Sequence, residues 1–248
     1  MLTFDKYKKY FLIKSYYNYA KNKAIQFLSH MLWKKKFILI REMAELDKER
    51  KLTPLMIERL DFVRCSSLEL VANEIYENKV SGSVAELGVS QGLFARHINY
   101  LFPDRVLYLF DTFEGFDERD WVVEKEKFPD SVWQEFKVKD IQKVMDRMPY
   151  KDKCIIKKGY FPDSIDGLEE KFCFVSIDVD LYQPILEGLR YFYPRLNQGG
   201  YIFVHDYNQS WYKGVKQALR EFCEESGCAL FPLSDYGGTA VISKGSQK

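Results

Sequence analysis

From Ser83 onward, short apolar runs alternate with stretches of helical periodicity, and this alternation constrains the fold more than any other feature. The apolar runs lie at about residues 83–88, 106–111, 154–158, 173–178 and 200–205. The helical stretches lie at about residues 91–101, 140–148, 182–194 and 213–226, and two last strands are expected at 229–232 and 239–243. Strands separated by helices form βαβ units. The pattern therefore predicts an α/β fold whose mostly parallel sheet has helices on both faces.

The N-terminal part of the chain differs from the rest. Residues 1–52 are expected to form a basic, aromatic-rich helical extension, and residues 53–248 the main domain, which opens with a helix after Thr53. Before Phe37, nine lysines are opposed only by Asp5. Such a segment suits peripheral contact with a membrane surface, or it is the solvated face of ordinary helices. The sequence leaves both interpretations open.

Composition narrows the classes of function. A formal net charge of +1 provides no overall field that would attract nucleic acid, so no nucleic-acid partner is expected. The five cysteines form no C-x-x-C pair and are typical of core thiols in a reducing compartment. No apolar run is long enough to span a bilayer, and no secretory leader is recognisable. We therefore expect a cytoplasmic protein, and the sequence leaves its oligomeric state open, a homo-oligomer included.

A glycine-punctuated turn follows the first apolar run. Its sequence is Val84-Ala-Glu-Leu-Gly-Val-Ser-Gln-Gly92, and Asp111 closes the next run about twenty residues later. Glycines let the backbone approach a ligand, while carboxylates at strand ends can bind ribose hydroxyls or an amino group. The spacing differs from the G-x-G-x-x-G of dinucleotide sites, which favours a small adenosyl cofactor. The candidate cofactor-binding residues are Glu86, Gly88, Gly92 and Asp111.

Two later strands also end in polar side chains. Asp178 and Asp180 follow one strand, and His205 and Asp206 follow the next. Ligands of open parallel sheets bind outside the carboxyl ends of the strands, so these groups should converge with Glu86. We expect Asp178, His205 and Asp206 to hold one divalent cation. The carboxylates favour Mg²⁺, whereas the imidazole shifts the preference slightly toward softer first-row metals.

The same acids have two further interpretations. A cation here would lower the pKa of a substrate hydroxyl, and Asp180 would then take its proton as general base. Alternatively, the aspartates cap the helix expected from Leu181 to Pro194 and the turn after Val204, because aspartate is a favoured N-cap residue.

The connection from Phe113 to Lys139 is too long for a plain loop. It is either a lid or substrate wall, or a helical insert that packs its aromatic side chains on the domain.

Several segments match one known pattern in order and spacing. They are Val84 to Gly92, Phe110 to Phe116, Gly159 to Ser164, Ile177 to Tyr182, and Pro194 to Tyr207. Through them the chain, over about residues 60–243, resembles the macrocin O-methyltransferase family of S-adenosylmethionine-dependent, metal-dependent sugar O-methyltransferases. The first fifty residues carry none of these segments.

The resemblance implies a class I, Rossmann-like methyltransferase fold with a seven-stranded sheet whose last strand is antiparallel, preceded here by extra N-terminal helices. It implies that Glu86 and Gly88 line the methionine side of S-adenosylmethionine and that Asp111 binds its ribose. It further implies that Asp178 and Asp206 bind Mg²⁺ and that Asp180 is the candidate base. The family often has Asp-Asp-Tyr where this chain has His205-Asp206-Tyr207, so position 205 is either a ligand or a neighbour of the ligands.

The expected function is methylation of a sugar hydroxyl on a bacterial surface glycan or a glycosylated natural product. The side chains that could stack on such a sugar are Trp121, Trp133, Trp211 and Tyr212, or these side chains belong to the core. A second hypothesis is a non-catalytic module that binds the adenosyl cofactor and docks to a membrane or an enzyme complex. An oxidoreductase on a related sheet is disfavoured by the glycine spacing.

Overall fold

A computed structural model describes residues 23, 51 and 61–245. The expected N-terminal extension, its membrane contact and the start of the first helix of the main domain fall outside these residues. Within the described part, no helix is both long and apolar enough to cross a membrane.

One seven-stranded sheet forms the centre of the domain, in the order β3-β2-β1-β4-β5-β7-β6. The strands are β1 (Ser83–Leu87), β2 (Leu107–Asp111), β3 (Cys154–Lys158), β4 (Phe172–Ile177), β5 (Leu196–Val204), β6 (Leu230–Pro232) and β7 (Ala240–Ser243). β1 to β5 pair in parallel, and β7 runs antiparallel to both of its neighbours. The expected mostly parallel sheet with an antiparallel last strand is therefore confirmed.

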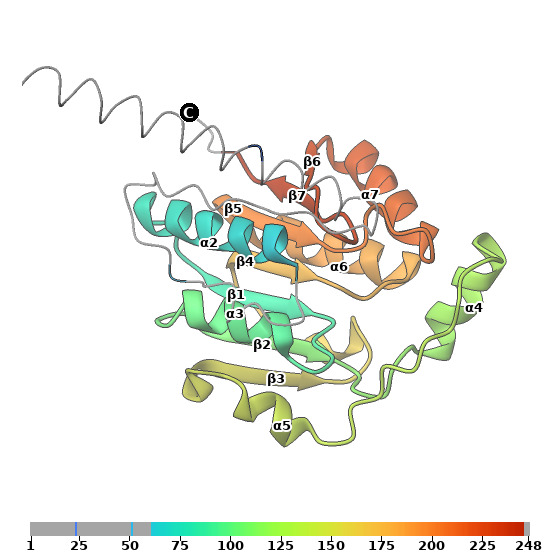
Figure 1. The fold of residues 1–248 in the computed structure, drawn as a ribbon, viewed down its shortest axis with the longest axis horizontal. Coiled ribbons are helices and arrows are strands. Elements are labelled where there is room, and N and C mark those ends of the chain that lie inside the picture. The colour runs from blue at the N-terminus through green and yellow to red at the C-terminus, as the bar shows by residue number, and fades with distance from the viewer. Residues whose placement is uncertain (1–22, 24–50, 52–60, 246–248) are drawn as a thin grey trace, which may run out of the picture. The chain divides into compact units, whose positions relative to one another are not determined.

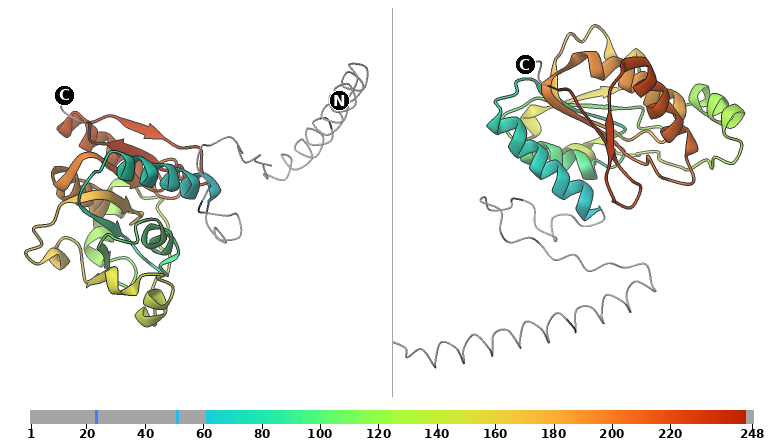
Figure 2. Two further views of the ribbon diagram at one scale, coloured as in Figure 1. Left: turned by 90° about the vertical axis from the view of Figure 1, so that its left-hand side faces the viewer. Right: turned by 90° about the horizontal axis from the view of Figure 1, so that it is seen from above.

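Helices cover both faces of this sheet, as Figures 1 and 2 show. They are α2 (Phe62–Glu77), α3 (Leu93–Leu101), α4 (Glu118–Lys127), α5 (Ile141–Asp146), α6 (Tyr182–Arg195) and α7 (Lys213–Ser226), with short 3₁₀ turns at Lys151–Lys153 and Asp163–Ile165. One apolar core lies between the sheet and α6 and α7, and a second lies between the sheet and α2, α3 and α5. Every residue of β1 and β4 is buried, as a strand between two helical layers requires.

The strand order reverses at β1, which pairs with β2 on one side and with β4 on the other. Such a switch point opens a crevice at the carboxyl ends of the two central strands. Directly after β1, Gly88 has φ +87, and a Cβ there would lie 2.1 Å from the carbonyl oxygen of Asp178. Only glycine fits at this contact, so the two loops that border the crevice pack backbone against backbone.

The long connection from Phe113 to Lys139 contains α4, and we call it the insert. In Figure 1 it stands at the right, beyond the arrowheads of the strands. The side chains of Phe116, Trp121 and Phe128 pack against the core that contains α6 and α7. The insert is thus a helical element that packs its aromatic side chains on the domain, and its residues Phe116 and Phe136 also border the crevice.

Candidate active site

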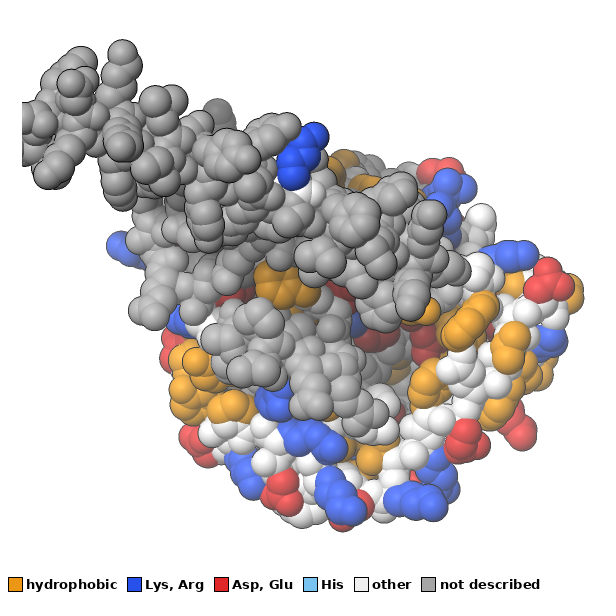
Figure 3. All heavy atoms as spheres, in the orientation of Figure 1, with side chains coloured by type: hydrophobic (Ala, Val, Ile, Leu, Met, Phe, Trp, Pro, Cys, Tyr) orange, Lys and Arg blue, Asp and Glu red, His pale blue; other side chains and the backbone are white. Residues whose placement is uncertain are grey.

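A cleft of about 560 Å³ occupies the crevice at the carboxyl ends of the strands. Figure 3 shows acidic side chains in a recess beside the insert. Seven of the eight residues that the sequence singled out line this cleft: Glu86, Gly88, Asp111, Asp178, Asp180, His205 and Asp206. Gly92 is not among the lining residues. Gly92 is the N-cap residue of α3 and has a φ of +76. A Cβ there would lie 2.7 Å from a methyl group of Val144, so the absence of a side chain allows close packing against Val144.

Asp111 organises the glycine turn after β1. Its Oδ2 accepts hydrogen bonds from the backbone N–H groups of Val89 and Ser90, both at 2.7 Å. Its Oδ1 accepts one from the N–H of Phe113 at 2.6 Å. Each carboxylate oxygen can accept more than one hydrogen bond, so Oδ1 keeps capacity for a ligand hydroxyl.

Glu86 is buried, with 1% of its surface exposed. Burial raises the pKa of this carboxyl well above its usual range; the cation of Arg64 opposes the shift, and the charges of Asp178 and Asp111 add to it. Its Oε2 has no hydrogen-bond partner within the described part of the chain. A buried acceptor without a donor is costly, which suits a position that receives a donor from a ligand.

Arg64 is a site residue that the sequence analysis missed. It comes from α2, and its side chain is 4% exposed. Its guanidinium donates to Asp178 Oδ2 at 2.9 Å and to Ser176 Oγ at 3.1 Å, and it lies over the ring of Phe94 at 3.8 Å. The available signal was its position one turn before Leu68, on the face of the helix that also carries Ala72 and Ile75.

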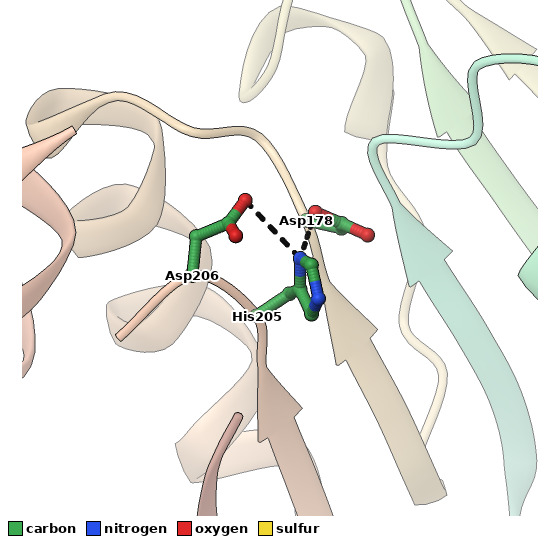
Figure 4. Close-up of side chains that lie close together, drawn as sticks. All are labelled: Asp178, His205 and Asp206. Carbon is green, nitrogen blue, oxygen red and sulfur yellow. Dashed lines mark ion pairs between the residues drawn. The ribbon is translucent and has the colours of Figure 1, made fainter. Parts of the chain in front are cut away.

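The three expected metal ligands meet in one cluster, which Figure 4 shows. His205 Nδ1 lies 3.2 Å from Asp178 Oδ1 and 3.1 Å from Asp206 Oδ2. One ligand atom from each residue lies within 4.8 Å of the others. This spacing suits a shared cation, and two carboxylates with an imidazole form a donor set for a divalent metal.

The charges of the cluster are strongly coupled. Burial and the charge of Arg64 oppose protonation of His205, but Asp178 and Asp206 outweigh them and raise its pKa to about 9. Burial alone would raise the pKa of Asp178, whereas the neighbouring cations of His205 and Arg64 hold it well below its usual range. Without a metal, the imidazolium therefore supplies the positive charge between the two carboxylates.

Asp180 and Asp206 both have left-handed backbone, with φ of +62 and +59. Aspartate tolerates this region at some cost, and such strain clusters at functional sites. Burial, followed by the charges of Asp178 and Asp206, raises the pKa of Asp180 well above its usual range. The N-cap of α6 is Leu181, without a side-chain cap. The capping interpretation of Asp178 and Asp180 is therefore wrong.

Gly237, in the turn between β6 and β7, is a second residue that the sequence analysis did not assign to the site. A Cβ at this position would lie 2.3 Å from Asp206 Oδ1 and 3.1 Å from the ring of His205. The turn thus covers the cluster at van der Waals distance. Sequence alone gave only a turn signal here.

Aromatic side chains form one wall of the cleft. Phe116 and Phe136 of the insert line it, together with Trp211 and Tyr212. Of the expected sugar-stacking residues, Trp121 and Trp133 do not line the cleft: they pack against Phe116, with centroid distances of 6.0 and 5.4 Å. They support the wall instead of forming its surface.

Comparison with known proteins places this geometry in a family. The model of the family described as Macrocin-O-methyltransferase (TylF) matches residues 19–242. The chain belongs to the macrocin O-methyltransferase family. The match begins well before the sequence segments that carry the resemblance, so it takes in part of the N-terminal region that carries none of them.

Individual relatives agree with this assignment. The mycinamicin III 3''-O-methyltransferase of Micromonospora griseorubida is 25% identical over 178 residues, which cover 66% of this chain and 69% of that protein. The structure of the O-methyltransferase NovP superposes with a TM-score of 0.62 at 18% identity, covering 74% of this chain and 80% of NovP. The structure of the calicheamicin methyltransferase CalS11 also superposes with a TM-score of 0.62 at 18% identity, covering 78% of this chain and 83% of CalS11. At these identities the two structures establish the fold, a class I Rossmann-like methyltransferase.

Proposed function

We propose that this macrocin O-methyltransferase family member transfers a methyl group from S-adenosylmethionine to a sugar hydroxyl, with a divalent cation at Asp178, His205 and Asp206. The acceptor is a glycosylated natural product or a surface glycan. One observation carries the proposal: a single cleft holds the glycine turn with Glu86 and Asp111 on one side and the three-residue cluster on the other.

The cofactor side fits an adenosyl amino acid. The unpartnered Oε2 of Glu86 is suited to accept from an ammonium group, and Asp111 Oδ1 is suited to accept from a ribose hydroxyl. Gly88 brings backbone to the floor of the cleft where any side chain would collide with Asp178. S-adenosylmethionine would supply a methyl group on a sulfonium leaving group, so the chain has only to position the reactants and remove a proton.

The cluster fits a divalent cation. Asp178, Asp206 and His205 would hold it, and a cation there would lower the pKa of an acceptor hydroxyl. Mg²⁺ prefers oxygen ligands, whereas an imidazole suits Mn²⁺ and other first-row ions. We therefore expect His205→Asp to shift the preference from Mn²⁺ toward Mg²⁺ in calorimetric titrations.

Asp180 is the candidate general base. Burial and the charges of Asp178 and Asp206 make its carboxyl retain a proton. A cation held by Asp178, His205 and Asp206 would offset those two charges and favour the ionised form of Asp180, whose carboxylate could then take the proton of the acceptor hydroxyl. Binding of the cation and availability of the base are linked in this way.

The decisive test uses labelled S-adenosylmethionine, Mg²⁺ or Mn²⁺, and a panel of glycosides, glycans and nucleotide sugars. Asp178→Ala should abolish methyl transfer, while calorimetry should still detect binding of S-adenosylmethionine to this variant. Full activity of that variant in a chelator would refute the metal role. Binding of a nicotinamide dinucleotide with no binding of S-adenosylmethionine would refute the cofactor.

A further inference from the structure

Helix α6 is capped from outside its own segment. Its N-cap, Leu181, offers no side-chain hydrogen bond. Instead the backbone N–H of Tyr182, the first helical residue, donates to Glu124 Oε2 at 2.9 Å. The other oxygen, Oε1, accepts from Ser131 Oγ at 2.6 Å. Glu124 belongs to α4 of the insert, so a residue far away in sequence takes the place of the missing cap.

The position of Glu124 is unusual for a glutamate, because its exposure is 0%. A carboxylate is costly to bury unless donors and positive potential surround it. The start of α6 supplies both, since the N–H of Tyr182 donates to the carboxylate and the helix dipole favours negative charge there. Gly214, at the start of α7, leaves the space: a Cβ there would lie 2.6 Å from Oε2. Three segments therefore meet at this one side chain.

Both sides of this contact lead to the cleft. Tyr182 lies two residues after Asp180, at the end of the loop that carries the candidate base and the metal ligand Asp178. On the other side, α4 also carries Trp121, which stacks on Phe116 of the aromatic wall with an interplanar angle of 9°. The contact thus joins the acceptor wall to the loop of the base.

We propose that Glu124 is a positioning residue that holds the aromatic wall of the insert in register with the Asp178–Asp180 loop. The insert is then a fixed wall and not a lid, and its acceptor contacts are set before the acceptor binds. The acceptor part of this inference rests on the proposed function; the anchoring itself does not.

Hydrogen exchange measured by mass spectrometry on the full chain tests the anchoring. In Glu124→Ala, the buried N–H of Tyr182 and the buried hydroxyl of Ser131 lose their hydrogen-bond partner, which costs about 1–3 kcal/mol. We therefore expect amide hydrogens in the insert and in the first turn of α6 to exchange at least about ten times faster than in the wild type. Glu124→Gln keeps one acceptor oxygen for the N–H of Tyr182 and should largely restore protection. Asp140→Ala, which removes the exposed N-cap of α5, is the matched control.

Two further measurements separate positioning from general stability. Affinity for S-adenosylhomocysteine, followed by calorimetry, should be the same in Glu124→Ala as in the wild type. The KM for the glycoside selected by the panel should rise severalfold in the alanine variant and recover in the glutamine variant. The proposal would be overturned if amide exchange in the insert were the same in Glu124→Ala as in the wild type. It would also be overturned if β1 and α3 lost as much protection as the insert does. If the panel yields no acceptor, the proposed function fails while the exchange result still decides the anchoring.

Discussion

At the scale of single residues, the site combines backbone strain with close backbone approach. Asp180 and Asp206 adopt positive φ, and the surrounding loops must supply the energy that holds them there. Gly237 lies close to the Asp206 carboxylate, which restricts the orientations that this carboxylate can adopt. The cluster is therefore positioned by contacts that its own side chains do not provide.

Gly237→Ala tests this restriction. The added methyl group would displace the Asp206 carboxylate, because that side chain can rotate more readily than the backbone can shift. We expect about 10- to 100-fold weaker binding of Mn²⁺, as is usual when the support of a ligand is lost, with little change in folding stability. Gly245→Ala, where a Cβ meets open space, is the control. Calorimetry that shows equal Mn²⁺ affinity in both variants would contradict the expectation.

Asp120 makes stability depend on pH. Burial raises its pKa from 3.8 to about 6, although Tyr160 donates a hydrogen bond to it. The folded state therefore binds this proton more tightly than the unfolded chain, and the stabilisation is complete below about pH 4 and lost as the pH rises through about 6. Asp120→Asn should raise the free energy of unfolding by about 3 kcal/mol at pH 8 and leave it unchanged near pH 4. Urea titrations at both pH values, with the exposed Asp152→Asn as reference, measure this.

At the scale of elements, α2 contributes more than a covering layer. It delivers Arg64 into the space between the ends of β1 and β4, where the guanidinium pairs with Asp178 and its charge also acts on Glu86. A buried ion pair adds little net stability, but removal of one partner leaves an uncompensated charge. The helix and the two strands are therefore coupled through electrostatics as well as packing.

Arg64→Met should lower the free energy of unfolding by about 3–5 kcal/mol for this reason. In a double-mutant cycle with Asp178→Asn, the two changes should be non-additive by about 0.5–3 kcal/mol, since the second removes the charge that the first left unpaired. Arg105→Met gives a reference for an arginine that donates to the carbonyl groups of Val80 and Gly82 and whose acidic neighbour, Asp104, is exposed. Additive losses in the cycle would show that the pair is not coupled.

At the scale of the whole molecule, the domain gathers its site from segments that lie far apart in the chain. The sheet order puts β1 beside β4, so the glycine turn and the cluster border one cleft although about ninety residues separate them. Ligands that bind only this assembled state stabilise the fold by mass action.

S-adenosylhomocysteine at 100 times its dissociation constant should add about 2.7 kcal/mol and raise the midpoint of thermal unfolding by about 5–10 °C. Asp111→Ala should reduce that increase, because it removes both the support of the glycine turn and the proposed acceptor for the ribose. Scanning calorimetry with and without the ligand gives the comparison. A midpoint that S-adenosylhomocysteine leaves unchanged in the wild type would contradict the cofactor assignment.

Sequence reasoning predicted the elements with strong periodicity and the residues at strand ends. Strand-end positions are predictable because all parallel strands deliver their carboxyl ends to one edge, and this rule alone brought Asp111, Asp178 and Asp206 together. Contacts made across the fold were not predictable. Arg64 carries no local motif, Gly237 has a role only because β7 returns beside β5, and Trp121 lies behind Phe116 because the insert folds back on itself.

The antiparallel return of β7 also affects how the chain is made. β7 fills the edge of β5 and brings with it the turn that covers the cluster. While a ribosome is still adding the residues of β7, β5 is an open edge with unpaired backbone groups, which is a template for aggregation. Newly synthesised chains therefore pass through a stage in which β5, the strand that ends at His205 and Asp206, is an unpaired lateral strand of the sheet, and chaperones would act at that stage.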